Sequence, residues 1–477
     1  MEKEKASMTV YIPISFPAID ELVSGTKLKP DKVRVLLHQM YLSRLSQSGY
    51  TGKQKNNILN YIFDEGYVGL HSKVLKLLLS TYYKKYLDFL IDKKLLRTRE
   101  SPSSEATYTK NFNSIHYKLA PELFHASGTL KHFRKESISD KCVLKAITKT
   151  RDGFKLYESK KSVSVQMEAI HEALYGMEQS VRFDLESAET WVRNHLAILS
   201  NSDTYSEEQM EKSSDNLINE LELLNSINEG VSFNCKVDQF GERLYTPLKR
   251  VARYMRRFMY FENHSETELA CLDISNSQLY FSTLLVNRNI IETIIPEFLP
   301  IAKIAEKYGD QIDFKRYIEA CINGTIYDEW IRIANHTDRN VAKKELIQIL
   351  FCKNNAKMPG IKIFRDHFPS VAKFFREIKA LKEDALPFIT KTYLDKRGNF
   401  KADSYHCNLS CATQRLESRI FIKIISQSLL DKEIKPFFTI HDSVYFPKYL
   451  TEKVQQIITD EFHLLGIAHP KLKLSTP

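Results

Sequence analysis

Apolar side chains recur every three or four residues over most of the chain, which is the spacing of an amphipathic helix. In the first third of the chain, this spacing predicts a helix from about Lys29, a second over Ile58–Tyr67 and a third, basic helix from Thr81. After Leu96, two short β-like runs flank a polar loop. This region is therefore predicted to hold three helices followed by a β-hairpin.

The helical pattern returns between Ser164 and Leu224, with a polar break at Asn201–Asp203. It predicts two long helices, of which the second is acidic. The expected fold class is α+β and mostly helical. The predicted segments are an extended leader (1–28), a domain (29–122), a basic connector without an assigned role (123–163), a helical region (164–230) and a C-terminal region (231–477).

Two stretches in the last region combine β-prone residues with an acidic residue. Leu272–Tyr280 reads L-D-I-S-N-S-Q-L-Y, and Phe437–Phe446 reads F-F-T-I-H-D-S-V-Y-F with Asp442 at a predicted turn. Taken alone, an Asp in a turn is most often only a turn residue. However, Asp273 on a strand and Asp442 at a hairpin tip can meet on one sheet. Two adjacent carboxylates can hold a pair of metal ions about 3.5–4 Å apart, as phosphoryl transfer requires.

A third stretch lies between these two. Thr337 or Asp338 can cap a helix that begins near Arg339. Two cations near a helix N-terminus are disfavoured by the helix dipole, so they need an anionic partner. Lys343 to Phe351 spans about 12 Å, near the length of a nucleoside triphosphate. One side of this helix carries Arg339, Lys343, Ile347 and Phe351. The cations can hold phosphates while the ring stacks on a base; the alternative is an ordinary amphipathic helix with cations at one end.

Composition favours a polyanionic partner. The chain of 477 residues has a formal net charge of +10, which suits nucleic acid. The densest basic cluster comprises Lys249, Arg250, Arg253, Arg256 and Arg257. It is either a phosphate contact or a solvated helix face. The seven cysteines lack a C-x-x-C pair, and no signal peptide or membrane-spanning run is recognised. A cytoplasmic protein without a membrane partner is expected.

In this order, the three stretches resemble motifs of the polymerase A superfamily, which comprises DNA polymerase I-like enzymes and single-subunit phage-type polymerases. The match is close to small phage or mobile-element members that read D-I-x-N-S-Q and I-H-D-S. The motif residues are Asp273-Ile274-Ser275 with Gln278, Arg339-x3-Lys343-x7-Phe351, and His441-Asp442-Ser443. Gln414 stands where the family keeps a helical Gln, and Asp238–Tyr245, with Arg243, is similar to a D-x-x-G-R-x-Y motif of the RNA enzymes.

The resemblance implies a right-hand fold with palm and fingers in residues 231–477 and residues 164–230 in the place of the thumb. Asp273, Asp442 and the Ile274 carbonyl would bind two Mg²⁺ ions, with Mn²⁺ as a substitute. Residues 29–122 resemble a winged helix, in which Lys84 and Lys85 would contact DNA; a plain helical bundle is the alternative. Nucleotide contacts are implied for Arg339, Lys343, Phe351, Gln278 and Ser275, and primer-template contacts for His441, Gln414, Arg243, Lys249 and Arg253.

The sequence departs from the family pattern at the expected sugar-contacting positions. Gln278 replaces a Glu of the DNA enzymes, and Phe351 lacks the hydroxyl of the Tyr in the RNA enzymes. Both favour deoxynucleotides or poor discrimination between the sugars, whereas Ser443 matches the RNA enzymes. The leading hypothesis is a DNA polymerase without a proofreading exonuclease, acting on a DNA primer-template in phage or mobile-element replication. The alternatives are an RNA polymerase or primase on the same fold, and a non-catalytic DNA-binding replication or transcription factor.

Overall fold

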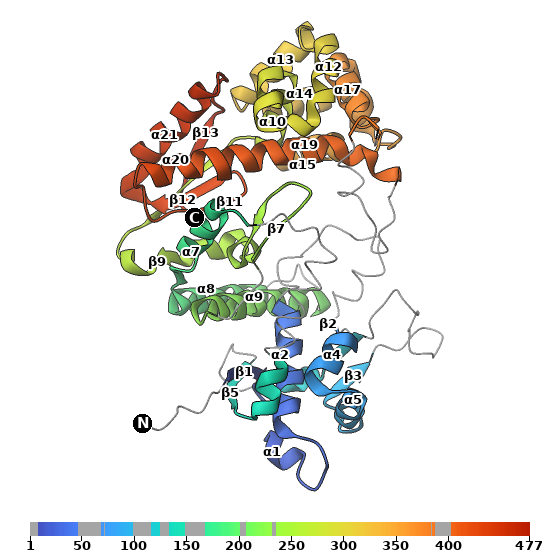
Figure 1. Cartoon of the computed structure of the whole chain (residues 1–477), viewed down its shortest axis with the longest axis vertical. Helices are drawn as coiled ribbons and strands as arrows, with labels where there is room; N and C mark the ends of the chain where they lie inside the picture. The colour runs from blue at the N-terminus through green and yellow to red at the C-terminus, as the bar shows by residue number, and fades with distance from the viewer. Residues whose placement is uncertain are drawn as a thin grey trace. The chain divides into compact units, whose positions relative to one another are not determined.

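The chain folds into two compact units (Figure 1). Unit 1 comprises Met1–Lys160, Phe183–Val231 and Arg250–Phe258, and unit 2 comprises Lys161–Arg182, Ser232–Lys249 and Met259–Pro477. The computed structural model describes residues 8–45, 68–70, 72–98, 116–124, 133–147, 167–200, 207–230, 235–382, 384–386 and 402–477. These residues are mostly helical and carry small sheets, so the predicted α+β class is confirmed.

Unit 1 contains helices and a three-stranded sheet of order β2-β4-β3. The elements are β1 (Met8–Pro13), α1 (Ile19–Leu22), α2 (Pro30–Leu45), β2 (Val68–Gly69), α4 (Ser72–Leu79), α5 (Tyr83–Asp92), β3 (Leu96–Thr98), β4 (His116–Leu119), β5 (Phe133–Ile138), α8 (Leu185–Ser200) and α9 (Glu207–Asn228). The predicted helix at Ile58–Tyr67 lies outside the described residues. Lys84 and Lys85 are exposed on α5, whose opposite side buries Leu87 and Leu90.

Residues of the predicted leader and connector pair with each other inside unit 1. Strand β1 is antiparallel to β5 and pairs Val10 with Glu136 and Ile12 with Arg134. Val10 and Ile12 are fully buried because alternate residues of a strand face one side, where the core lies. Met8–Pro13 is therefore a core strand, which differs from the separate leader expected from the sequence. The two long helices predicted beyond residue 164 are confirmed as α8 and α9.

Unit 2 is built around a four-stranded antiparallel sheet of order β11-β12-β10-β13. Its strands are β10 (Leu269–Ile274), β11 (Phe438–Ile440), β12 (Ser443–Pro447) and β13 (Leu472–Ser475). Leu272 and Ile274 of β10 and Val444 of β12 enter the hydrophobic core of the unit. Because side chains alternate along a strand, Asp273 and Ser443 lie on the opposite face. The sheet thus has one apolar face and one that carries the acidic motif residue.

Helices supply the remainder of unit 2. Figure 1 shows α12, α13, α14 and α17 gathered in one bundle, with the fully buried Trp330 and Tyr317 in its core. The helices are α7 (Ala169–Glu178), α10 (Ser277–Thr283), α11 (Arg288–Ile294), α12 (Leu299–Tyr308), α13 (Ile312–Ile322), α14 (Ile326–Ala334), α15 (Arg339–Phe351), α16 (Pro359–His367), α17 (Pro369–Ile378), α19 (Asn408–Ser418), α20 (Ser426–Asp431) and α21 (Thr451–Leu464).

Short strands and one π-helical segment connect these elements. Strand β7 (Lys236–Val237) pairs with β8 (Leu244–Tyr245), and β6 (Val181–Phe183) pairs with β9 (Met259–Phe261). The π-helical segment Arg419–Ile425 joins α19 to α20. Within the described parts of the chain, no helix has the length and apolar character needed to cross a membrane.

The contact between α15 and α16 leads to a stability prediction. Gly360 of α16 abuts the Glu345 carboxylate, which accepts a hydrogen bond from Trp330 Nε1 at 2.8 Å and contacts His336 Nε2 at 2.6 Å. A Cβ at position 360 would displace this carboxylate and leave the buried indole N–H without its acceptor. Gly360→Ala should therefore lower the free energy of unfolding by roughly 1–3 kcal/mol in urea denaturation.

Gly176→Ala is the matched control, because no atom lies within 4 Å of a Cβ at this exposed position of α7. This variant should gain up to about 1 kcal/mol from the higher helix propensity of alanine. Equal losses in the two variants would contradict the assigned role of Glu345.

Candidate active site

The two acidic motif residues meet on one sheet, as the sequence predicts. Asp273 of β10 pairs in register with Ser443 of β12, and Ser443 Oγ donates to Asp273 Oδ1 at 2.7 Å. Asp442 immediately precedes Ser443 in the turn between β11 and β12, and the turn is tight enough to hold His441 at φ 58°. One carboxylate therefore comes from a strand and the other from the turn that precedes the neighbouring strand, although 169 positions separate them in the sequence.

The electrostatics of Asp442 indicate crowded negative charge. Burial raises the pKa of Asp442 well above its ordinary value, and the negative charges of Glu417 and Asp273 raise it further. Like charges in one site oppose each other's ionisation unless a cation is present. A cation bound here would relieve this repulsion.

Glu417 is a third carboxylate of the site that the sequence analysis did not identify. It lies on α19, and its side chain is 1% exposed. Its Oε1 pairs with Arg243 Nη2 at 2.7 Å, and its Oε2 accepts from Ser277 Oγ at 3.3 Å and from the amide of Gln278. Burial raises the pKa of Glu417, while Arg243 opposes that rise. The available signal was its spacing three residues after Gln414, which places both residues on one side of a helix.

Glu417 also determines how the predicted nucleotide residue Gln278 is oriented. The Gln278 amide nitrogen donates to Glu417, so the carboxylate sets which way the amide points. The other amide atom, Oε1, is buried and has no hydrogen-bond partner among the described residues. An orphaned buried acceptor is an unfavourable arrangement that a bound donor would relieve.

The Asp238–Tyr245 segment is a turn that delivers Arg243 to Glu417. Asp238 Oδ1 accepts from the backbone N–H groups of Phe240 and Gly241, both at 2.8 Å, and Oδ2 accepts from Arg243 N at 3.0 Å. A Cβ on Gly241 would lie 2.8 Å from Gln414 Oε1, so this close approach requires glycine. At the end of the turn, the Tyr245 ring meets His441 edge-on, with ring centroids 6.4 Å apart.

Arg339 contacts Tyr327, a residue within electrostatic range of both Asp273 and Asp442. Asp338 caps α15 by accepting from Asn340 N at 3.0 Å, which confirms the predicted helix start. The Arg339 guanidinium lies 5.2 Å from the centroid of the Tyr327 ring. Burial raises the pKa of Tyr327, and the charges of Asp442 and Asp273 contribute to the rise. Tyr327 therefore connects the cationic end of α15 to the carboxylate site.

The remaining residues of α15 are arranged in the predicted row. Arg339 and Lys343 are exposed, and Arg339 Nε also pairs with Asp328 at 3.1 Å. Phe351, at the opposite end of the helix, packs partly buried against the core of unit 2. The contacts of these residues with a nucleotide stay a prediction.

The basic run that follows Tyr245, for which a solvated helix face was one alternative, is not one continuous helix. It forms two 3₁₀ helices, Pro247–Arg250 and Arg253–Phe258, separated at Ala252, whose N–H donates to Glu220. Arg253 is exposed in unit 1. Lys249 belongs to unit 2, where its ammonium donates to the Leu244 carbonyl. Contacts of Lys249 and Arg253 with nucleic acid stay a prediction.

The donor chemistry of the sheet fits hard divalent cations. Asp273 and Asp442 supply carboxylate oxygens, which Mg²⁺ and Mn²⁺ prefer. The backbone of Ile274, predicted to add a carbonyl ligand, follows Asp273 directly on β10. Over the described ranges, no group of three or more His, Cys, Asp and Glu side chains is arranged to hold a metal. Any metal at this sheet therefore takes part of its coordination from backbone, water or substrate, as Mg²⁺ usually does.

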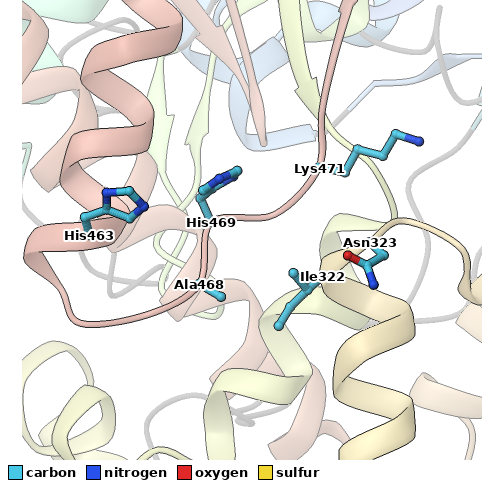
Figure 2. A pocket seen from close by; sticks show the side chains of 6 residues that line it. All are labelled: Ile322, Asn323, His463, Ala468, His469 and Lys471. Atoms are coloured by element: carbon cyan, nitrogen blue, oxygen red, sulfur yellow. The ribbon is translucent and has the colours of Figure 1, made fainter.

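A separate pocket of about 460 Å³ lies in unit 2 (Figure 2). Figure 2 shows Ile322 and Asn323 at the end of α13, facing Ala468 and His469 on the loop that leads to β13. Lys471 on this loop also lines the pocket. The residues that line the pocket include neither Asp273 nor Asp442.

Comparisons with known proteins add little to this geometry. No protein-family model and no curated protein sequence matches the chain. Among solved structures, the chain is similar to the POL domain of Pol1 from M. smegmatis in complex with DNA primer-template and dNTP. The match has 12% sequence identity and a TM-score of 0.35, and it covers 70% of this chain and 74% of that chain. A likeness this distant carries no statement about the fold or activity of the present chain.

The buried Arg243–Glu417 pair generates a prediction about stability. Arg243→Met should cost roughly 3–5 kcal/mol in urea unfolding, because it leaves the Glu417 carboxylate buried without its counter-charge. Arg243→Met combined with Glu417→Gln should recover most of this loss. Arg288→Met, which removes an exposed pair with Glu292, serves as control and should cost no more than about 1 kcal/mol. A double variant as unstable as Arg243→Met would contradict the assigned role of the pair.

Glu178, a second buried acid in unit 2, should make the stability of the fold depend on pH. Burial raises the pKa of Glu178 from 4.5 to about 7, and burial lowers the pKa of the neighbouring Lys249 to about 8. The unfolded chain releases the proton of this acid at a lower pH than the folded chain does. The free energy of unfolding therefore falls as the pH rises from the ordinary pKa of the acid to its pKa in the folded protein.

Glu178→Gln should therefore gain stability relative to the wild-type protein, by roughly 2–3 kcal/mol, as the pH rises from about 5 to 7. Thermal unfolding over this pH range measures the difference. Glu172→Gln, at an exposed position of the same helix, is the control and should show no such trend. A flat difference between wild type and Glu178→Gln would contradict the raised pKa.

Proposed function

We propose that the chain is a template-directed DNA polymerase that adds nucleotides to a primer 3′ end by a two-metal mechanism. The observation that carries this proposal is the register of one sheet, which pairs Asp273 with Ser443, the residue directly after Asp442. Arg339 would supply the cation that anionic phosphates need beside metal ions. The support is its contact with Tyr327, whose pKa is raised by burial and by the charges of Asp442 and Asp273.

Different residues of the chain would bind the metal ions and the nucleotide. Asp273, Asp442 and the Ile274 carbonyl would hold two Mg²⁺ ions, which lower the pKa of the primer hydroxyl and stabilise charge on the α-phosphate when bound. Arg339 and Lys343 would bind the triphosphate. The bond from the primer 3′ oxygen to the α-phosphorus forms, the bond from that phosphorus to the bridging oxygen breaks, and pyrophosphate leaves.

Further side chains would align the substrates. His441 is positioned beside Asp442 to contact the primer end, and Gln414, held against Gly241, would meet the minor groove of the new base pair. Gln278, oriented by Glu417, and Ser275 would border the nucleotide, while Phe351 would stack on its base or ribose. Gln278 and Phe351 favour deoxynucleotides. The proposed setting is replication of a phage or mobile element, without proofreading.

We also propose that unit 1 contains a winged-helix module for DNA. The support is the order α2, β2, α4, α5, β3, β4 with a sheet of order β2-β4-β3, together with the exposed Lys84 and Lys85 on α5. Helices α8 and α9 are proposed for the role of the thumb. Arg253, exposed in the same unit, would contact the phosphate backbone.

An RNA polymerase or primase is the second candidate. The hydrogen bond from Ser443 Oγ to Asp273 favours it, because it makes Ser443, the residue shared with the RNA enzymes, part of the acidic site. The choice between deoxynucleotides and ribonucleotides is therefore one readout of the test.

Primer extension on a primed single-stranded template tests the proposal. With Mg²⁺ and dNTPs, wild-type protein should extend the primer, and Asp273→Asn and Asp442→Asn should each lose roughly 10³-fold or more in rate, because a metal contributes several kcal/mol to the transition state. Asp366→Asn, at an exposed position on α16, is the matched control and should keep wild-type activity.

Three outcomes discriminate among the candidate functions. Extension with rNTPs alone would select the RNA polymerase or primase. Tight DNA binding with no incorporation of either nucleotide would favour a non-catalytic DNA-binding protein. Nucleotide incorporation by Asp442→Asn at the wild-type rate would contradict the two-metal proposal.

A further inference from the structure

The edge strand β13 brings two lysines beside the acidic motif. Lys473 is the register partner of Asp273, on the side of β10 away from β12. Ser275 N donates to Lys471 O at 3.0 Å, which continues the pairing by two residues. Directly paired residues of antiparallel strands project to the same face. Lys473 therefore shares the sheet face of Asp273, although 200 positions separate the two residues.

Neither lysine is neutralised by a neighbour. Both are exposed, and neither forms an ion pair with a carboxylate of any described residue. Asp273 accepts from Ser443 instead, at 2.7 Å on the other side of β10. Two free ammonium groups thus border the carboxylate site on the side opposite Asp442, a distribution that suits a ligand with both metal-bound and lysine-bound oxygens.

The position of Lys471 connects this side of the sheet to the cationic helix. A Cβ on Gly324 would lie 3.1 Å from Lys471 Cδ and 3.1 Å from Ser275 Cβ, so the lysine stem runs close to both residues. Gly324, at φ 70°, forms the turn just before α14, which carries Tyr327. Tyr327 in turn contacts Arg339. Lys471 therefore lies close to the turn that leads into α14, the helix whose Tyr327 contacts Arg339.

We propose that Lys473 and Lys471 bind the β- and γ-phosphates of the nucleotide and the pyrophosphate released from it. This inference rests on the proposed function. When the α-phosphorus exchanges its bridging oxygen for the primer 3′ oxygen, the electron pair of the broken bond stays on pyrophosphate. Lysine is a compact point charge that binds phosphate without fixed geometry. The two ammonium groups stabilise the added charge on the leaving group.

Product inhibition by inorganic pyrophosphate during primer extension tests the proposal. Lys473→Ala and the Lys471→Ala/Lys473→Ala double variant should raise the pyrophosphate inhibition constant, and the KM for the nucleotide, by about tenfold or more in the double variant. Lys473→Arg should retain most of the binding. Lys453→Ala, an exposed unpaired lysine on α21, is the matched control and should leave both constants unchanged.

Primer-template affinity, measured by fluorescence anisotropy, separates nucleotide phosphates from backbone phosphates. It should be the same in wild type and the double variant. A loss of DNA affinity with an unchanged pyrophosphate constant would assign the lysines to the DNA backbone and overturn the proposal.

A calorimetric titration with pyrophosphate and Mg²⁺ keeps this test independent of activity. If wild-type protein extends no primer, the proposed function fails on its own account. The titration then decides the lysine site separately: weaker pyrophosphate binding by the double variant than by wild type supports the site, and equal binding overturns it.

Discussion

The buried ion pair between Arg243 and Glu417 is the interaction on which the acidic site depends. A carboxylate that is 1% exposed is tolerable only with a counter-charge and hydrogen bonds, and Glu417 has both. The pair joins the turn that begins at Asp238 to helix α19, and Glu417 acts on the strand motif through Ser277 and Gln278. Three segments far apart in the sequence are thereby held together: the turn at Asp238, helix α19 and the residues that follow strand β10.

The charge balance of this region explains why a cation and an anion suit it together. Asp273, Asp442 and Glu417 place three carboxylates in one neighbourhood, and Arg243 compensates one of them. Burial raises the pKa of Asp442, and the remaining repulsion raises it further. Cations that border the site, Arg339 on α15 and Lys473 on β13, stand outside this inner group. Metal ions bound to the carboxylates would offset the inner negative charge, and phosphates bound to Arg339 and Lys473 would offset the outer positive charge.

Local patterns were sufficient for several elements of the site. The β-prone runs on either side of Asp442 predicted the hairpin β11–β12, and the capping residue Asp338 predicted the start of α15. These features depend on contacts between residues close in sequence. The form of the basic run Lys249–Arg257 could not be found in this way, because Glu220, a distant residue, accepts the N–H of Ala252 where the run is interrupted.

The sequence by itself determined the hairpin around Asp442 and the start of the cationic helix α15, because strand alternation, turn residues and caps act over a few positions. Only the tertiary structure decided that Glu417 is buried against Arg243 and that Lys473 stands opposite Asp273. Burial of a charge and the register of a distant strand arise from contacts between remote segments. The residues next to a helical Glu do not show whether it is buried, and the residues next to a Lys on an edge strand do not show which residue it pairs with.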